Sequence, residues 1–137
     1  MYTFQKIDAK EEDYLYIQDS QITNAGKGLY TAIDIYKDEI ISYFIGEELP
    51  QHEAERRESI GESEYFMTLP NGNILDCKHL FCFAKFANDA SGSISSIFKN
   101  NASIAMNDEE KICLVAHKKI KAGEEIFVSY GKKYWGR

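Results

Sequence analysis

Apolar and polar residues alternate in short runs along this chain, and the runs predict strands more often than helices. Residues 14–18 alternate aromatic and β-branched side chains, which favours a strand. Residues 29–35 and the apolar run at 112–115 predict two further strands. Asp19-Ser20 and Asn107-Asp108-Glu109-Glu110 are polar stretches typical of turns. The pattern predicts a mostly β fold with a few short helices.

The middle of the chain carries two sharper local signals. Residues 65–69 and 74–76 are apolar runs that flank Pro70-Asn71-Gly72-Asn73, and an Asn-Gly turn between apolar runs predicts a β-hairpin. Pro50 is followed by strong helix formers up to residue 60, which predicts a short solvated helix. We expect Gly61 to cap the C-terminus of that helix.

A second helix is predicted over residues 79–87. Its apolar residues recur at three- and four-residue intervals, at Leu80, Phe83, Ala84 and Phe86 or Ala87. We assign Phe81, Phe83 and Phe86 to the core. Residues 1–12 show no clear period and are interpreted as a lead-in or an edge strand.

Composition indicates one ordinary globular domain. The chain has 137 residues, enough for a core of its own, and we expect a single domain over residues 1–137. Its residues are 44% hydrophobic, 28% charged and 13% aromatic, which argues against disorder. The net charge of −6 disfavours a direct nucleic-acid binder and suits a basic partner, although solubility alone also explains mild acidity.

Three cysteines at irregular spacing form neither a disulfide framework nor a Cys-x-x-Cys pair. The sequence shows no signal peptide and no apolar run long enough to span a membrane, so we expect an intracellular chain, nuclear or cytoplasmic, with reduced thiols. Cys77, His79 and Cys82 are close enough in sequence to suggest zinc. A structural zinc site needs four ligands, however, and no fourth is evident.

Gly26-Lys27-Gly28 is the first segment that suggests chemistry. Two glycines separated by one residue permit backbone angles closed to other residues and let a ligand approach the main chain. Thr31 stands where a dinucleotide fingerprint needs its third glycine, and no phosphate loop occurs. A plain hairpin turn and a ligand-binding turn are the two interpretations that remain.

Several segments together resemble the SET-domain protein lysine methyltransferases, in a short form without a Cys-rich post-SET segment. The resemblance covers about residues 24–135. The matching segments are Gly26-Lys27-Gly28-Leu29-Tyr30-Thr31-Ala32, Tyr43-Phe44-Ile45-Gly46-Glu47, Phe86-Ala87-Asn88-Asp89, Asn100-Asn101-Ala102 and Gly123-Glu124-Glu125-Ile126-Phe127-Val128-Ser129-Tyr130-Gly131. It implies a SET-domain fold of small sheets, in which the C-terminal segment threads beneath the loop after Asn88 like a pseudoknot.

The resemblance also implies a function. It implies methyl transfer from S-adenosylmethionine to a lysine amine in a protein or peptide, with histones among the candidate substrates. It implies cofactor contacts from Gly26, Lys27, Gly28, Leu29, Tyr65, Asn88, Asp89 and Trp135. It implies a lysine channel lined by Tyr65, Val128 and Tyr134, and it assigns Tyr130 as the catalytic residue, with its hydroxyl near the amine.

The sequence departs from the family pattern around the Asn turn. Asp89 and Ala90 stand where the family has His and Ser, and the usual Cys and Pro before Asn101 are absent. Two alternatives therefore stand beside the enzyme. One is a SET-fold module that binds a Lys-containing peptide or the cofactor without turnover, and the other is a small β-rich interaction domain unrelated to methyl transfer.

Two further expectations concern the end of the sequence. Glu124 and Glu125 are interpreted as turn residues that aid solubility, since this methyl transfer needs no acid–base pair. No cysteine follows Cys113, so we expect a metal-free protein without the zinc segment that follows many SET domains. Tyr134 and Trp135, or a second subunit of a homodimer, would then supply the missing wall of the channel.

Overall fold

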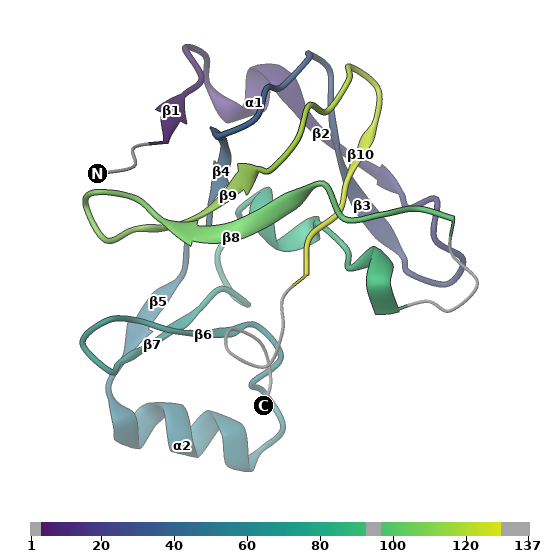
Figure 1. The fold of residues 1–137 in the computed structure, drawn as a ribbon. Coiled ribbons are helices and arrows are strands. Elements are labelled where there is room, and N and C mark those ends of the chain that lie inside the picture. Colours follow the sequence, from purple (N-terminus) through teal and green to yellow (C-terminus); the bar gives the residue numbers. More distant parts are fainter. Residues whose placement is uncertain (1–3, 93–96, 130–137) are drawn as a thin grey trace.

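The computed structural model describes residues 4–92 and 97–129, which form three small sheets and two α-helices. This confirms the mostly β prediction (Figure 1). The helices are α1 (Glu11–Tyr14) and α2 (Gln51–Ser59), with 3₁₀ turns η1 (Ala84–Phe86) and η2 (Ala90–Gly92). The strands are β1 (Gln5–Lys6), β2 (Leu15–Asp19), β3 (Lys27–Thr31), β4 (Glu39–Tyr43), β5 (Glu47–Leu49), β6 (Phe66–Thr68), β7 (Ile74–Asp76), β8 (Ala102–Met106), β9 (Ile112–Ala116) and β10 (Glu125–Ile126).

The three sheets have the strand orders β1-β4-β9-β8, β10-β3-β2 and β5-β7-β6. All neighbouring strands are antiparallel except the β1–β4 pair. The first segment is therefore an edge strand, one of the two interpretations of residues 1–12. Figure 1 shows β5, β6, β7 and α2 together at one end of the molecule, away from β2, β3 and β10.

Among the described residues, buried apolar side chains form one larger core, one smaller core at α2, and a third cluster of Ile40, Cys113 and Val115. The larger core takes side chains from seven strands in all three sheets, and its fully buried members include Leu29, Ile41, Leu114 and Ile126. Strand β9 is buried at every residue, as its continuous apolar run predicts. The smaller core lies between α2 and its sheet and consists of Leu49, Ala54, Phe66 and Ile74.

The predicted hairpin and the helix at 51–59 are both confirmed. Strands β6 and β7 pair across the Asn-Gly turn, where Gly72 has a positive φ of 88°. Helix α2 ends in a Schellman motif, with Glu62 N donating to Arg57 O (2.9 Å) and Gly61 N to Glu58 O (3.1 Å). Only Ala54 of α2 is buried, which explains its polar sequence.

The helix predicted over residues 79–87 is wrong, because only η1 forms there. The Lys85 ammonium donates to three loop carbonyls, Cys77 O (3.0 Å), Lys78 O (3.2 Å) and Leu80 O (2.9 Å). These bonds fold the loop back onto η1 instead of continuing a helix. The core assignment of Phe81 is also wrong, since it is 59% exposed, whereas Phe83 and Phe86 are half-buried against the larger core.

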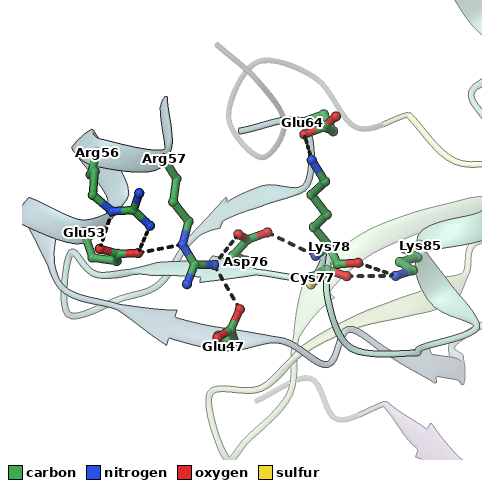
Figure 2. Close-up of polar contacts among 9 residues, drawn as sticks. All are labelled: Glu47, Glu53, Arg56, Arg57, Glu64, Asp76, Cys77, Lys78 and Lys85. Atoms are coloured by element: carbon green, nitrogen blue, oxygen red, sulfur yellow. Dashed lines mark hydrogen bonds and ion pairs between the residues drawn. The ribbon is translucent and has the colours of Figure 1, made fainter. Parts of the chain in front are cut away.

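Arg57 joins α2 to its sheet (Figure 2). Its Nη1 donates to Glu47 Oε1 and to Asp76 Oδ2, each at 2.9 Å, and its Nε donates to Glu53 Oε2 at 2.8 Å. Asp76 is 0% exposed, so the guanidinium supplies the cation that its carboxylate needs. Hydrogen bonds from Arg56 and Arg57 lower the pKa of Glu53 to about 2.

We expect Arg57→Met to lower the thermal unfolding midpoint by roughly 10 °C, because it leaves the buried Asp76 carboxylate without a cation. Arg56→Met is the matched control, since the Arg56 side chain is 60% exposed and pairs with Glu53 but not with Asp76. The control should change the midpoint far less, in line with surface ion pairs generally. Equal effects in a thermal melt would contradict the role assigned to Arg57.

Tyr14 contributes a part of the folding stability that is lost at alkaline pH. It is buried, its hydroxyl donates to Ile41 O at 2.7 Å, and burial together with Glu11 and Glu39 raises its pKa above the usual range. Its pKa is higher in the folded state than in the unfolded state. Its contribution is therefore complete below about pH 10, the unfolded pKa, and is lost as the pH rises further.

We expect Tyr14→Phe to cost about 1 kcal/mol at neutral pH, through loss of one buried hydrogen bond. The same variant should lose less stability than the wild type as the pH rises through about 10. Unfolding midpoints measured on both sides of that pH test this. Tyr36→Phe is the control, because Tyr36 is 52% exposed. Parallel pH profiles for wild type and Tyr14→Phe would rule out the assignment.

Among the described residues, none of the helices has the length and apolar character needed to span a bilayer.

Candidate active site

One peptide group organises the site. It joins Phe127 to Val128: its N–H donates to Asn88 O (2.8 Å), while its C=O accepts from Asn101 N (2.9 Å) and Ala102 N (3.0 Å). The N–H and C=O of one extended peptide group point in opposite directions, so these partners lie on opposite sides of the segment. The segment after β10 is thus threaded between the two ends of the loop that leaves Asn88. This confirms the pseudoknot-like arrangement.

Asn101 fixes the register of the threaded segment with its side chain. Its Oδ1 accepts from Phe127 N (2.9 Å), and its Nδ2 donates to Glu125 O (3.1 Å). The side chain is 8% exposed and so offers the segment a buried donor and acceptor in place of a neighbouring strand. The sequence matched this Asn to a family motif but did not reveal this role.

Asn88 connects the threaded segment to the glycine turn. Its Nδ2 donates to Lys27 O at 2.9 Å, between residues that lie 61 positions apart in sequence. Strand β10 also pairs with β3, with Ile126 opposite Leu29. The structure therefore brings together the three segments that the sequence marked: residues 26–28, Asn88 and residues 125–128.

The glycine turn closes a hairpin, as the plain structural interpretation predicted. Ser20 N donates to Gly26 O (2.8 Å), and Gly26 has a positive φ of 75° that favours glycine. Gly28 is required for a different reason. A Cβ at this position would lie 2.2 Å from Glu125 Oε2 and 3.3 Å from Ser20 Cα. Its lack of a side chain makes room for a neighbouring carboxylate.

The solubility interpretation of Glu125 is wrong, because this side chain is 2% exposed. Its Oε2 accepts from Ser20 Oγ (2.7 Å), and its Oε1 accepts from Gln21 N (2.8 Å) and the Tyr30 hydroxyl (3.2 Å). Burial, and next the charge of Glu125, raise the pKa of Tyr30. Glu124 does behave as a turn residue, exposed and accepting from Lys121 N at 2.8 Å. Alternation could not have separated the two glutamates, because Glu125 and the three residues after it are all buried.

The family model of the SET domain matches residues 26–131, which is most of the chain and includes all three segments. The chain belongs to the SET-domain family.

Two curated relatives of this SET domain are named as histone-lysine methyltransferases. The histone-lysine N-methyltransferase, H3 lysine-36 specific, of Eremothecium gossypii is 28% identical over 134 residues, 93% of this chain and 19% of the relative. Histone-lysine N-methyltransferase mes-2 of Caenorhabditis elegans is 28% identical over 109 residues, 77% of this chain and 14% of the relative.

The SET-domain fold is also found in similar solved structures. A humanized mutant of the Chaetomium thermophilum Polycomb Repressive Complex 2 is 30% identical with a TM-score of 0.70, over 89% of this chain and 16% of that chain. The complex in an autoinhibited conformation bound to S-adenosylmethionine is 28% identical with a TM-score of 0.68, over 88% of this chain and 15% of that chain. The chain spans less than a fifth of the length of each relative and structure described.

The SET domain places the remaining predicted residues in different environments. Leu29 and Val128 are fully buried in the larger core. The Lys27 side chain is exposed and pairs with Asp19 at 2.8 Å, so the backbone of Lys27 is the part that faces Asn88. Tyr65 is half-buried, with its ring centre 5.6 Å from Lys85 Nζ. The predicted contributions of these residues to binding stay predictions, and Tyr130, Tyr134 and Trp135 lie outside the described residues.

Asp89, which replaces the family His, organises its own loop. Its Oδ1 accepts from Ser91 N (2.9 Å), Ser91 Oγ (2.6 Å) and Asn100 Nδ2 (3.1 Å). Asn100 Oδ1 accepts in turn from Ala90 N (2.9 Å). The carboxylate thus begins η2 and ties the start of the loop to its end.

In residues 4–92 and 97–129, Glu47, Asp76 and His79 form the one group of three residues that could hold a metal ion. Arg57 donates to both carboxylates, and its positive charge opposes a second cation there. That group contains no cysteine. Cys77 and Cys82 are buried and hydrogen-bonded to each other, which raises the pKa of Cys77 and lowers that of Cys82.

The close approach at Gly28 leads to a double-mutant test. Gly28→Ala should cost about 1–3 kcal/mol of folding free energy, because the new methyl group overlaps Glu125 Oε2. In a Glu125→Ala background the overlap is gone, so the same substitution should cost clearly less. Denaturant unfolding of the four proteins measures this difference. An unchanged cost would show that Glu125 does not impose the glycine.

Proposed function

We propose that this SET domain transfers a methyl group from S-adenosylmethionine to the side-chain amine of lysine in a protein. The observation that carries the proposal is the convergence of the glycine turn, Asn88 and the threaded segment in a chain of this family. The names of the curated relatives, both histone-lysine methyltransferases, support the same reaction. They also support a histone as the candidate substrate, and the net charge of −6 suits its basic segments.

The glycine turn fits the cofactor. Gly26 is exposed and a Cβ there would meet no atom within 4 Å, so a ligand can approach the backbone at this point. Asn88 uses one of its two amide donors to hold Lys27 O, which leaves the second donor and Oδ1 for its role at the cofactor. We propose Gly26, Lys27, Gly28, Leu29, Tyr65, Asn88, Asp89 and Trp135 as the cofactor-binding residues. S-adenosylmethionine, when bound, supplies a methyl group activated by its sulfonium.

The protein then has to hold the substrate lysine with its amine neutral and in line with that methyl group. A lysine with the usual pKa near 10.4 is only about 0.1% neutral at pH 7.4. An apolar channel beside a cation lowers the lysine pKa and raises that fraction. Aromatic walls exclude water and favour cations by about 0.5–2 kcal/mol per contact. We propose Tyr65, Val128 and Tyr134 as the walls and Tyr130 as the residue whose hydroxyl orients the amine.

No metal enters this proposal, because the sulfonium already activates the methyl group and the step needs no Lewis acid. Nucleic acid and membrane do not enter it either. A homodimer is proposed as one way to complete the channel, with Tyr134 and Trp135 as the other.

The second candidate is a SET-fold module that binds a Lys-containing peptide or the cofactor without turnover. Asp89 favours it, because a carboxylate occupied within its own loop replaces the family His. The two candidates differ in turnover, and both require binding.

Methyl transfer from radiolabelled S-adenosylmethionine to a panel of basic proteins, located by mass spectrometry, tests the proposal. We expect incorporation at lysine, and in Tyr130→Phe a turnover lower by about 10-fold or more, a barrier increase of about 1.4 kcal/mol. Cofactor affinity should change much less, because the ring remains. Tyr36→Phe, at an exposed position, should retain full turnover.

Binding of the cofactor without incorporation would support the second candidate. An undiminished turnover in Tyr130→Phe would show that this residue only packs. Absence of binding to both the cofactor and Lys-containing peptides would defeat both candidates.

A further inference from the structure

The Glu125 side chain reaches across a whole sheet. Its residue lies in β10, its carboxylate passes over Gly28 of the central strand β3, and its hydrogen bonds end on Ser20 and Gln21, just after β2. The bonds join residues 105 and 104 positions apart in sequence. The transfer reaction proposed above does not use this carboxylate.

Burial makes the geometry of these bonds demanding. In the described part of the chain no cationic side chain pairs with Glu125. Its oxygens accept from the Ser20 hydroxyl and from Gln21 N and Nε2. The Tyr30 hydroxyl lies 3.2 Å from Oε1 and shares its one proton with Asp19 O at 2.7 Å. An unsatisfied buried carboxylate is very costly, so the donors must keep their positions for the charge to stay buried. The carboxylate therefore selects one shape for the chain at Ser20 and Gln21.

That shape continues to the glycine turn. Ser20 Oγ accepts from Ile22 N (3.1 Å), Ala25 N donates to Ile22 O (3.1 Å), and Ser20 N donates to Gly26 O (2.8 Å). These bonds fix the positions of Ile22, Ala25 and Gly26 relative to Ser20. The conformation of the loop therefore depends on Glu125 as far as Gly26 in the glycine turn.

We propose that Glu125 is a positioning residue, which holds the loop at residues 20–26 so that the backbone of Gly26 and Lys27 is ready to receive the cofactor. The inference rests on the proposed function. Asn88 holds the turn from its other side through Lys27 O, and Asn101 Nδ2 holds the backbone of Glu125. The segment that contains Glu125 therefore fixes the shape of the glycine turn and also contains the residue proposed for catalysis.

Calorimetric titration with S-adenosylmethionine, combined with amide exchange, tests the inference. Ser20→Ala removes one donor to Glu125 while keeping the buried charge and the strands. We expect it to weaken binding by roughly 10-fold, the effect of losing one hydrogen bond to a charged group, and to speed exchange of the Ile22 and Ala25 amides, which donate within the loop. Glu125→Ala should weaken binding at least as much.

Two variants make the test specific. Glu125→Gln keeps the shape, because its Oε1 can accept from Gln21 N and Tyr30 while its amide group donates to Ser20 Oγ. It should bind the cofactor within about threefold of wild type, since the loop geometry is retained. Glu124→Gln is the matched control at the exposed neighbour and should bind like wild type.

The outcomes separate the inference from the proposed function. Wild-type protein that binds the cofactor, with Ser20→Ala and Glu125→Ala binding equally well, would overturn the inference and leave the function standing. Loss in Glu125→Gln as large as in Glu125→Ala would also overturn it, because the shape is retained. Wild-type protein that binds no cofactor would end both.

Discussion

The peptide group between Phe127 and Val128 holds the site together, because it makes hydrogen bonds to the two ends of one loop in opposite directions. A buried backbone group needs a partner, and here the partners come from Asn88 on one side and from Asn101 and Ala102 on the other. If either end of the loop moved away, one buried donor or acceptor would lose its bond. The loop and the threaded segment therefore keep their positions together.

Helix α2 and its sheet form a more polar part of the molecule, separate from the loop and the threaded segment. Helix α2 and its sheet have a core of four residues, and Arg57 joins helix to sheet through carboxylates. The larger core lies behind the glycine turn and the threaded segment. Changes near α2 thus act mainly on its own small core and ion pairs, while the backbone contacts between Lys27, Asn88 and Val128 depend on the larger one.

Local sequence was sufficient where the deciding contacts are local. The Asn-Gly hairpin, the Gly61 cap and the continuous burial of β9 each depend on residues within a few positions, and all three were predicted. The helix at 79–87 was wrong because the Lys85 side chain competes for loop carbonyls, which apolar spacing does not reveal. Glu125 was misjudged because its donors lie about a hundred residues away in sequence. The resemblance found the right segments, but their hydrogen bonds came only from the structure.

The long separations in sequence have a consequence for the order of folding. Glu125 meets Ser20 over 105 positions and Asn88 meets Lys27 over 61, and contacts of this kind form late because the intervening chain must first be ordered. The hairpins β2–β3 and β8–β9 close locally and can form first. During synthesis, the glycine turn therefore waits for residue 125 to leave the ribosome, and until then it has no buried carboxylate to shape it.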